Sequence, residues 1–91
     1  MTKMERSEVL CDVSDLPAPL PLETIQIQLN QLSVDQYLKI VHRFRPKLLF
    51  PILQQRSFAY LLKEHRQDGL IEIYVWHQEN RELSQLIRGE S

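Results

Sequence analysis

The stretch FAYLLKEHRQDGLIEIYVWH, residues 58–77, decides the fold of this 91-residue chain. It contains two runs rich in aromatic and β-branched residues, 58–66 and 70–77, on either side of Asp68 and Gly69. An Asp-Gly pair between two such runs is the strongest short-range signal for a β-hairpin. The stretch therefore predicts two strands joined by a tight turn.

The register of this hairpin follows from the length of its turn. A two-residue turn pairs Gln67 with Leu70 and sets Leu61 opposite Trp76, a favourable cross-strand pair. The same register places Leu62 opposite Val75 and Tyr60 opposite His77. Alternate residues then form one uniformly apolar face, which we expect to face the helices, made of Phe58, Tyr60, Leu62, Ile71, Ile73 and Val75.

Two strand–helix units are predicted upstream of the hairpin. We expect the strands over 8–13 and 37–44 and the helices over 21–32 and 48–56. The second helix tolerates Pro51 if Lys47 is its N-cap, because Pro51 is then the fourth helical residue and needs no intrahelical partner for its nitrogen.

The order β-α-β-α-β-β favours an α/β (α+β) two-layer sandwich with two helices on one face of the sheet. The tail adds a short C-terminal helix, for which Asn80 is a candidate N-cap. We expect three parts: a disordered N-terminus over 1–7, the domain over 8–78, and a helical tail over 79–91.

Composition indicates one ordinary globular domain, with 43% hydrophobic and 25% charged residues. A formal net charge of −1 gives no global attraction to nucleic acid or to a membrane surface. The single cysteine, Cys11, excludes an internal disulfide, and no CxxC or HxxxH spacing favours zinc, so we expect no metal and no cofactor. The N-terminus lacks the apolar core of a signal peptide, so we expect a cytoplasmic protein.

A candidate anion-binding site lies just before the second helix. A helix N-terminus with basic side chains can hold an anion. The alternative is a solvated basic loop. The residues of this site are His42, Arg43, Arg45 and Lys47.

A candidate partner surface lies on the sheet face that points away from the two helices. Its apolar and aromatic residues are Tyr37, Val41, Leu61, Tyr74 and Trp76. Surfaces of this kind are typical of interaction sites for a protein partner or a second copy of the chain. The alternative is that the tail helix covers Trp76 with Leu83, Leu86 and Ile87.

Four short motifs, in this order and spacing, resemble a known family: Asp15-Leu-Pro-Ala-Pro-Leu-Pro21, His42-Arg-Phe-Arg-Pro46, Leu49-Phe-Pro51 and Arg56-Ser-Phe58. The chain resembles the sulfur-carrier fold of the TusA/SirA-like proteins and, more closely, the bacterial family called domain of unknown function 2249. The resemblance implies a mixed sheet in the order 1-2-4-3, with strand four antiparallel to the rest. It also implies a small cytoplasmic domain in a redox or nitrogen-oxide context, with no agreed activity.

One departure from the sulfur carriers concerns their mechanism. The resemblance places Ala18 where those proteins carry the cysteine that precedes Pro-x-Pro, and alanine has no nucleophile. Cys11 lies in the first strand among apolar neighbours, which favours a core residue over a reactive one. We therefore expect no enzyme but a protein-interaction or regulatory module. The alternative is a small-anion or small-molecule binding domain, and sulfur carriage ranks last.

Overall fold

The computed structural model describes residues 8–65 and 67–89 and confirms the expected order of elements. The elements are β1 (Glu8–Asp12), α2 (Leu20–Gln31), β2 (Tyr37–His42), α3 (Leu49–Gln55), β3 (Phe58–Glu64), β4 (Ile71–His77) and α4 (Arg81–Arg88). The expected disordered segment 1–7 lies outside the described residues. The strand and helix ends differ from the predicted ones by one or two residues, because the ends of such elements fray.

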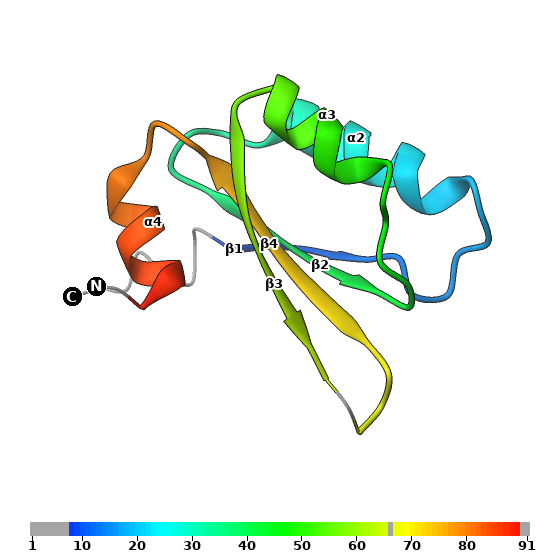
Figure 1. Ribbon diagram of the computed structural model, residues 1–91. Coiled ribbons are helices and arrows are strands. Elements are labelled where there is room, and N and C mark those ends of the chain that lie inside the picture. Colours follow the sequence, from blue (N-terminus) through cyan, green and yellow to red (C-terminus); the bar gives the residue numbers. More distant parts are fainter. Residues whose placement is uncertain (1–7, 66, 90–91) are drawn as a thin grey trace.

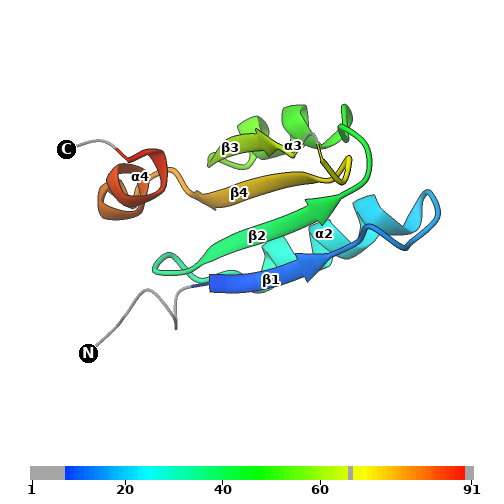
Figure 2. The same cartoon turned by 90° about the horizontal axis from the view of Figure 1, so that it is seen from below.

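The four strands form one mixed sheet in the order β1-β2-β4-β3. β1 runs parallel to β2, while β4 runs antiparallel to both β2 and β3. Figure 2 shows the four strands side by side, with β1 and β3 at the edges. This is the order and the strand direction implied by the resemblance.

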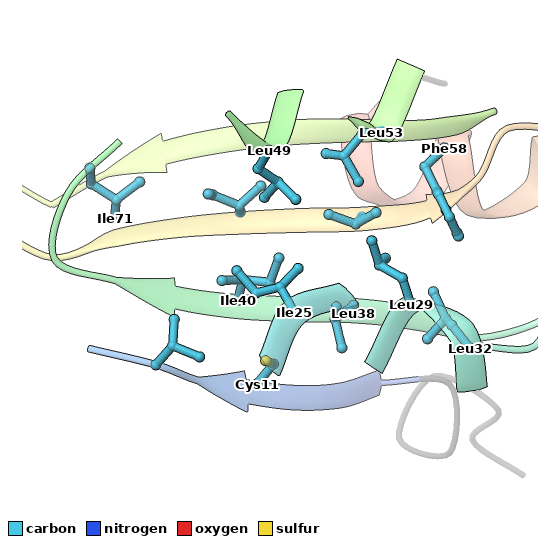
Figure 3. Packing of buried hydrophobic residues seen from close by; sticks show 13 residues of the cluster. Cys11, Ile25, Leu29, Leu32, Leu38, Ile40, Leu49, Leu53, Phe58 and Ile71 are labelled. Atoms are coloured by element: carbon cyan, nitrogen blue, oxygen red, sulfur yellow. The ribbon is translucent and has the colours of Figure 1, made fainter. Parts of the chain in front are cut away.

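Helices α2 and α3 lie together on one face of the sheet and enclose the main core (Figure 1). α2 contributes Ile25 and Leu29, which are four residues apart, a spacing that keeps both side chains on one side of the helix. Figure 3 shows these side chains meeting Leu38 and Ile40 of β2 and Cys11 of β1. The two-layer sandwich is therefore confirmed.

The start of α3 differs from the prediction by one residue. Leu48, not Lys47, is the N-cap, and no side chain caps the helix. Pro51 is consequently the third helical residue. It is still within the first turn, where a backbone N–H has no intrahelical partner.

The predicted hairpin register is wrong by two residues. The backbone N–H of His65 donates to Leu70 O at 2.9 Å, so four residues, 66–69, separate the last pair instead of two. Leu61 consequently faces Tyr74, and Trp76 faces Ala59. Gly69 does adopt a positive φ of 70°, but near the end of a longer loop.

The predicted face of each hairpin residue survives this shift, because side chains alternate with period two and a shift of two residues preserves the face. The predicted helix-facing set of the hairpin all packs into or against the main core: Phe58, Tyr60, Leu62, Ile71, Ile73 and Val75.

The tail helix α4 covers one end of the other sheet face, which decides between the two alternatives for that face. Trp76 is 0% exposed and packs with Tyr37 and Leu83 in a second, smaller core. The indole N–H of Trp76 donates to Ser84 Oγ at 2.7 Å. Tyr37 and Trp76 are therefore not part of an open partner surface, because α4 supplies the cover that two helices on the opposite face could not.

The ends of α4 match the sequence signals. The side chain of Asn80 accepts a hydrogen bond from the N–H of Leu83, which confirms the predicted N-cap. Gly89 ends the helix with a φ of 69°. Ile87 packs against the smaller core, whereas Leu86 is 59% exposed and takes no part in the cover.

Candidate functional site

A cleft of about 490 Å³ opens at the carboxyl ends of the parallel strands β1 and β2. Its two walls are the loop that leads to α2 and the segment that leads to α3, and both leave the sheet at the same end (Figure 1). Ligands of α/β sheets commonly bind outside the carboxyl ends of parallel strands. The residues that line the cleft are Val13, Ser14, Asp15, Leu16, Pro17, His42, Arg43 and Phe44.

The first wall, residues 13–17, is a tight turn held by local hydrogen bonds. Asp12 Oδ1 accepts both the backbone N–H of Ser14 at 3.0 Å and its hydroxyl at 2.7 Å, and these bonds lower the pKa of Asp12. The N–H of Leu16 donates to Val13 O at 3.1 Å. Asp and Ser favour such turns because their short side chains bond to nearby backbone groups.

His42 lies at the inner end of the second wall, residues 42–44, and is only 8% exposed. Its Nδ1 accepts the backbone N–H of Phe44 at 3.1 Å. Burial lowers its pKa below the ordinary value of 6.5, so the ring is neutral near pH 7. Because Nδ1 accepts a hydrogen bond, the proton of the neutral ring lies on Nε2.

Nε2 of His42 has no hydrogen-bond partner among residues 8–65 and 67–89. Within that same part of the chain, no fully buried side-chain nitrogen or oxygen lacks a partner. Nε2 must therefore reach the molecular surface, and the surface that His42 lines is the cleft. The ring presents an N–H donor there.

Arg43 joins the two walls. Its Nε donates to Ser14 O at 3.1 Å, and its guanidinium lies 3.6 Å from the carboxylate of Asp15. Both side chains of this ion pair are more than half exposed, so the pair itself adds little stability. The bond from Nε to Ser14 keeps the guanidinium at the mouth of the cleft.

The other two residues of the predicted anion site lie elsewhere. Arg45 pairs with Glu64 at the end of β3, through its Nε at 2.7 Å and a second nitrogen. Lys47 is exposed, and neither residue lines the cleft. The structure therefore brings together His42 and Arg43 but not all four residues.

Phe44 and Leu16 line the cleft together with the apolar residues Val13 and Pro17, and the sequence analysis selected none of these four for the site. Phe44 is 70% exposed at the rim, and Leu16 is the more covered of the two. The signal in the sequence was the position of Phe44 between two arginines, immediately after a strand. An aromatic residue there has no strand face that would bury it.

Of the predicted partner surface, only the residues that α4 does not bury remain partly exposed. Val41, Leu61 and Tyr74 are half-buried on the sheet face away from α2 and α3. Leu10 of the edge strand β1 lies on the same face and is 61% exposed. Leu10, Tyr74 and Leu61 lie in one cross-strand row, interrupted by Lys39 of β2, and Val41 lies in the next one. We refer to these four apolar residues as the open apolar row.

Charged groups border this row. Glu72 accepts the Tyr74 hydroxyl at 3.0 Å and lies 3.6 Å from the Lys39 ammonium and 3.2 Å from His65 Nε2. Burial and Glu72 raise the pKa of Tyr74 to about 12. Lys63 lies 5.3 Å from the centre of the Tyr74 ring.

Cys11 is buried on the helix side of β1. Burial and the neighbouring Asp12 raise the pKa of its thiol to about 11, so the thiolate is scarce near pH 7. Ala18 is exposed in the loop before α2. No group of three or more His, Cys, Asp or Glu side chains that could hold a metal ion occurs in the described parts of the chain.

Comparison with known proteins gives one match. The model of a family described as "Uncharacterized conserved protein (DUF2249)" matches residues 11–77. No curated protein and no solved structure matches the chain. The likeness to the TusA/SirA-like fold therefore stays a prediction. Within residues 8–65 and 67–89, no helix combines the length and the apolar character needed to cross a membrane.

Proposed function

The chain belongs to the family of uncharacterized conserved proteins DUF2249, and we propose that its domain is a non-enzymatic binding module that holds a small ligand in the cleft. The observation that carries this proposal is the composition of the cleft. Val13, Leu16, Pro17 and Phe44 supply apolar surface, while His42 and Arg43 supply the polar groups. Ligand sites typically combine mostly apolar walls with a few placed polar groups, in volumes of about 300–1,000 Å³.

The hydrogen bonds inside the cleft favour binding over catalysis. The Ser14 hydroxyl donates to Asp12. His42 Nδ1 accepts the backbone N–H of Phe44, so no carboxylate orients the ring through this nitrogen. A nucleophile needs a base within hydrogen-bond reach, and that base needs an orienting group. The described side chains of the cleft do not form this arrangement.

An NMR titration tests the proposal. Benzyl alcohol, benzamide and benzoate are each added to the ¹⁵N-labelled protein at millimolar concentration. We expect the amide signals of residues 13–17 and 42–44 to move, because the aromatic ring of the probe and the apolar walls of the cleft bury each other's surface from water. Shifts confined to other residues, or no shifts with any probe, would contradict the proposal.

A matched pair of variants locates the site. Phe44→Ala removes the rim of the cleft and should weaken binding by about tenfold, the effect of losing roughly half the burial of an aromatic ring. Leu48→Ala is the control, since Leu48 is also exposed, at 72%, on the same loop, but does not line the cleft. Equal effects of the two substitutions would place the ligand elsewhere.

A second candidate function is self-association through the open apolar row. It is favoured by Leu10, which is 61% exposed on the edge strand β1, on the same sheet face as the half-buried Leu61 and Tyr74. Sedimentation velocity tests it: Leu10→Lys should abolish a dimer, and Leu86→Lys on the exposed side of α4 should leave it intact. A monomer at every concentration removes this candidate. The cytoplasmic location and the redox or nitrogen-oxide context stay predictions from the resemblance.

A further inference from the structure

The cleft contains a polar group that the fold does not satisfy. His42 is 8% exposed, yet its Nε2–H has no partner among residues 8–65 and 67–89. Nε2 reaches the molecular surface at the cleft, so its N–H is open to water or to a ligand. A ligand that excludes water there must supply an acceptor, because a buried donor without one is costly. The ring cannot rotate to satisfy Nε2 without losing the bond from Phe44 to Nδ1.

An oxygen of a bound ligand would accept the hydrogen bond from Nε2–H of His42. The donor is neutral, so it can donate to either a neutral carbonyl oxygen or an anionic oxygen. Arg43 decides between them, because its guanidinium lines the same cleft and, within residues 8–65 and 67–89, pairs only with Asp15, in an exposed ion pair at 3.6 Å. Breaking that pair costs little, and an arginine can then add charge-assisted hydrogen bonds to the ligand.

The net charge of the cleft indicates how many negative charges the ligand carries. His42 contributes no charge and Arg43 one positive charge, while the exposed carboxylate of Asp15 lies on the opposite wall. A dianion such as phosphate would meet repulsion from Asp15 that one guanidinium does not offset. A single carboxylate is the better match, and the apolar walls suit a hydrocarbon body attached to it.

We propose that the ligand of the cleft is a monoanionic carboxylate with an apolar body, whose oxygen accepts the Nε2–H of His42 and whose charge is paired by Arg43. This inference rests on the proposed function, since it names the class of ligand for the same site. The carboxylate could belong to a small organic acid or to the C-terminus of a peptide, and both present the same group.

Matched probes test the charge and the source separately. Benzoate and benzamide share one ring, and only benzoate has the carboxylate. N-acetyl-leucine and its amide form a second pair that also differs only in the carboxylate. We expect the wild-type protein to bind benzoate about tenfold more tightly than benzamide, since a charge-assisted hydrogen bond replaces a neutral one. If the preference for N-acetyl-leucine over its amide exceeds that for benzoate over benzamide, the site is assigned to the C-terminus of a peptide. If the preference for benzoate over benzamide is the larger, the site is assigned to a small organic acid.

Variants of His42 separate its two nitrogens. His42→Asn keeps an acceptor for the Phe44 N–H near the position of Nδ1 but removes the donor at Nε2, so the preference for benzoate should fall to about twofold or less. His42→Gln places an amide N–H near Nε2 and should keep part of the preference. Emission of the single tryptophan, Trp76, reports whether each variant is folded.

Variants of arginine test the charge without touching the core. Arg43→Ala should remove the preference for benzoate and leave benzamide binding in place. Arg45→Ala is the control, because Arg45 carries the same charge two residues away but pairs with Glu64 outside the cleft. If benzoate and benzamide bind the wild type equally, the carboxylate is refuted while the binding module stands. If neither probe shifts residues 13–17 and 42–44, both proposals fall.

Discussion

Replacing Leu83 by alanine should detach α4 from the sheet and expose Trp76. Leu83 is 4% exposed and forms the smaller core with Trp76 and Tyr37. The same helix holds the Trp76 indole through Ser84 Oγ. α4 has eight residues, too few to remain helical in water without packing. Its position therefore depends on a few contacts, of which Leu83 is the most buried.

The magnitude follows from the atoms removed. Leu→Ala removes three carbon atoms, and each buried carbon contributes about 0.8 kcal/mol, for a total of about 2.4 kcal/mol. In a rigid core the cavity would add to this loss and bring it above 3 kcal/mol. α4 can instead separate locally while the main core stays folded, which limits the loss. We expect the free energy of unfolding to fall by about 2 kcal/mol.

The assay uses the one tryptophan of the chain. Trp76 emission should shift to longer wavelength in Leu83→Ala before any denaturant is added, and urea unfolding followed by far-ultraviolet circular dichroism gives the loss of stability. Leu86→Ala is the control, because Leu86 lies on the same helix but is 59% exposed. It should cost less than about 0.5 kcal/mol and leave the emission unchanged.

One result would refute this reasoning. If Leu83→Ala matches Leu86→Ala in both stability and emission, Trp76 is not held by α4 in solution. The sheet face would then be open from end to end, and the wider partner surface that includes Tyr37 and Trp76 would return. The cleft would be unaffected, since the two loops that line it leave the sheet at the end opposite α4 (Figures 1 and 2).

Further predictions concern individual residues outside the smaller core. Asn80→Ala should lower the free energy of unfolding by about 1–2 kcal/mol in urea, because Asn80 caps α4 and its amide also donates to Val34 O at 2.8 Å. Ser57→Gly should raise the melting temperature, with a gain of about 0.5–1 kcal/mol, because Ser57 has a φ of 61° that glycine adopts without strain. Cys11, with a pKa raised from 9.0 to about 11, should react with a disulfide reagent at pH 8 at least about 100-fold more slowly in the folded than in the unfolded chain. His42 has a folded pKa below its unfolded 6.5, so the unfolded chain binds the proton more readily; the free energy of unfolding should fall as the pH drops below 6.5, and His42→Asn should reduce this fall in urea titrations.

The order of elements and the faces of the strands could be predicted because both depend on local periodicity. Leu38 and Ile40 had to share a face with each other, and Phe58 with Tyr60 and Leu62, whatever lay beside them. For the same reason the error of two residues in the hairpin register moved no side chain to the wrong face. The loop length itself was not predictable, since Gly69 can take its positive φ in a two-residue or a four-residue connection.

The site was only half predictable. Arg43 and Arg45 are two residues apart, and sequence proximity suggested one anion site. β2 ends at His42, and beyond the strand each arginine contacts a different carboxylate: Arg43 that of Asp15 in the loop before α2, and Arg45 that of Glu64 in β3. The paths of two loops decide which charged side chains form ion pairs. These paths depend on contacts across the whole sheet.

The amino-acid sequence by itself determined the layers of this protein, because the periods of helix and strand divide apolar from polar residues before any tertiary contact forms. Only the tertiary structure decided what covers Trp76 and what reaches the cleft. An amphipathic tail such as 81–88 can pack on any apolar surface within its reach, and the preference for one place is set by shape and by single bonds such as that from Trp76 to Ser84. Likewise, only the turn after β2 brings the N–H of Phe44 to Nδ1 of His42, which leaves Nε2 as the ring donor, without a partner in the described part of the chain.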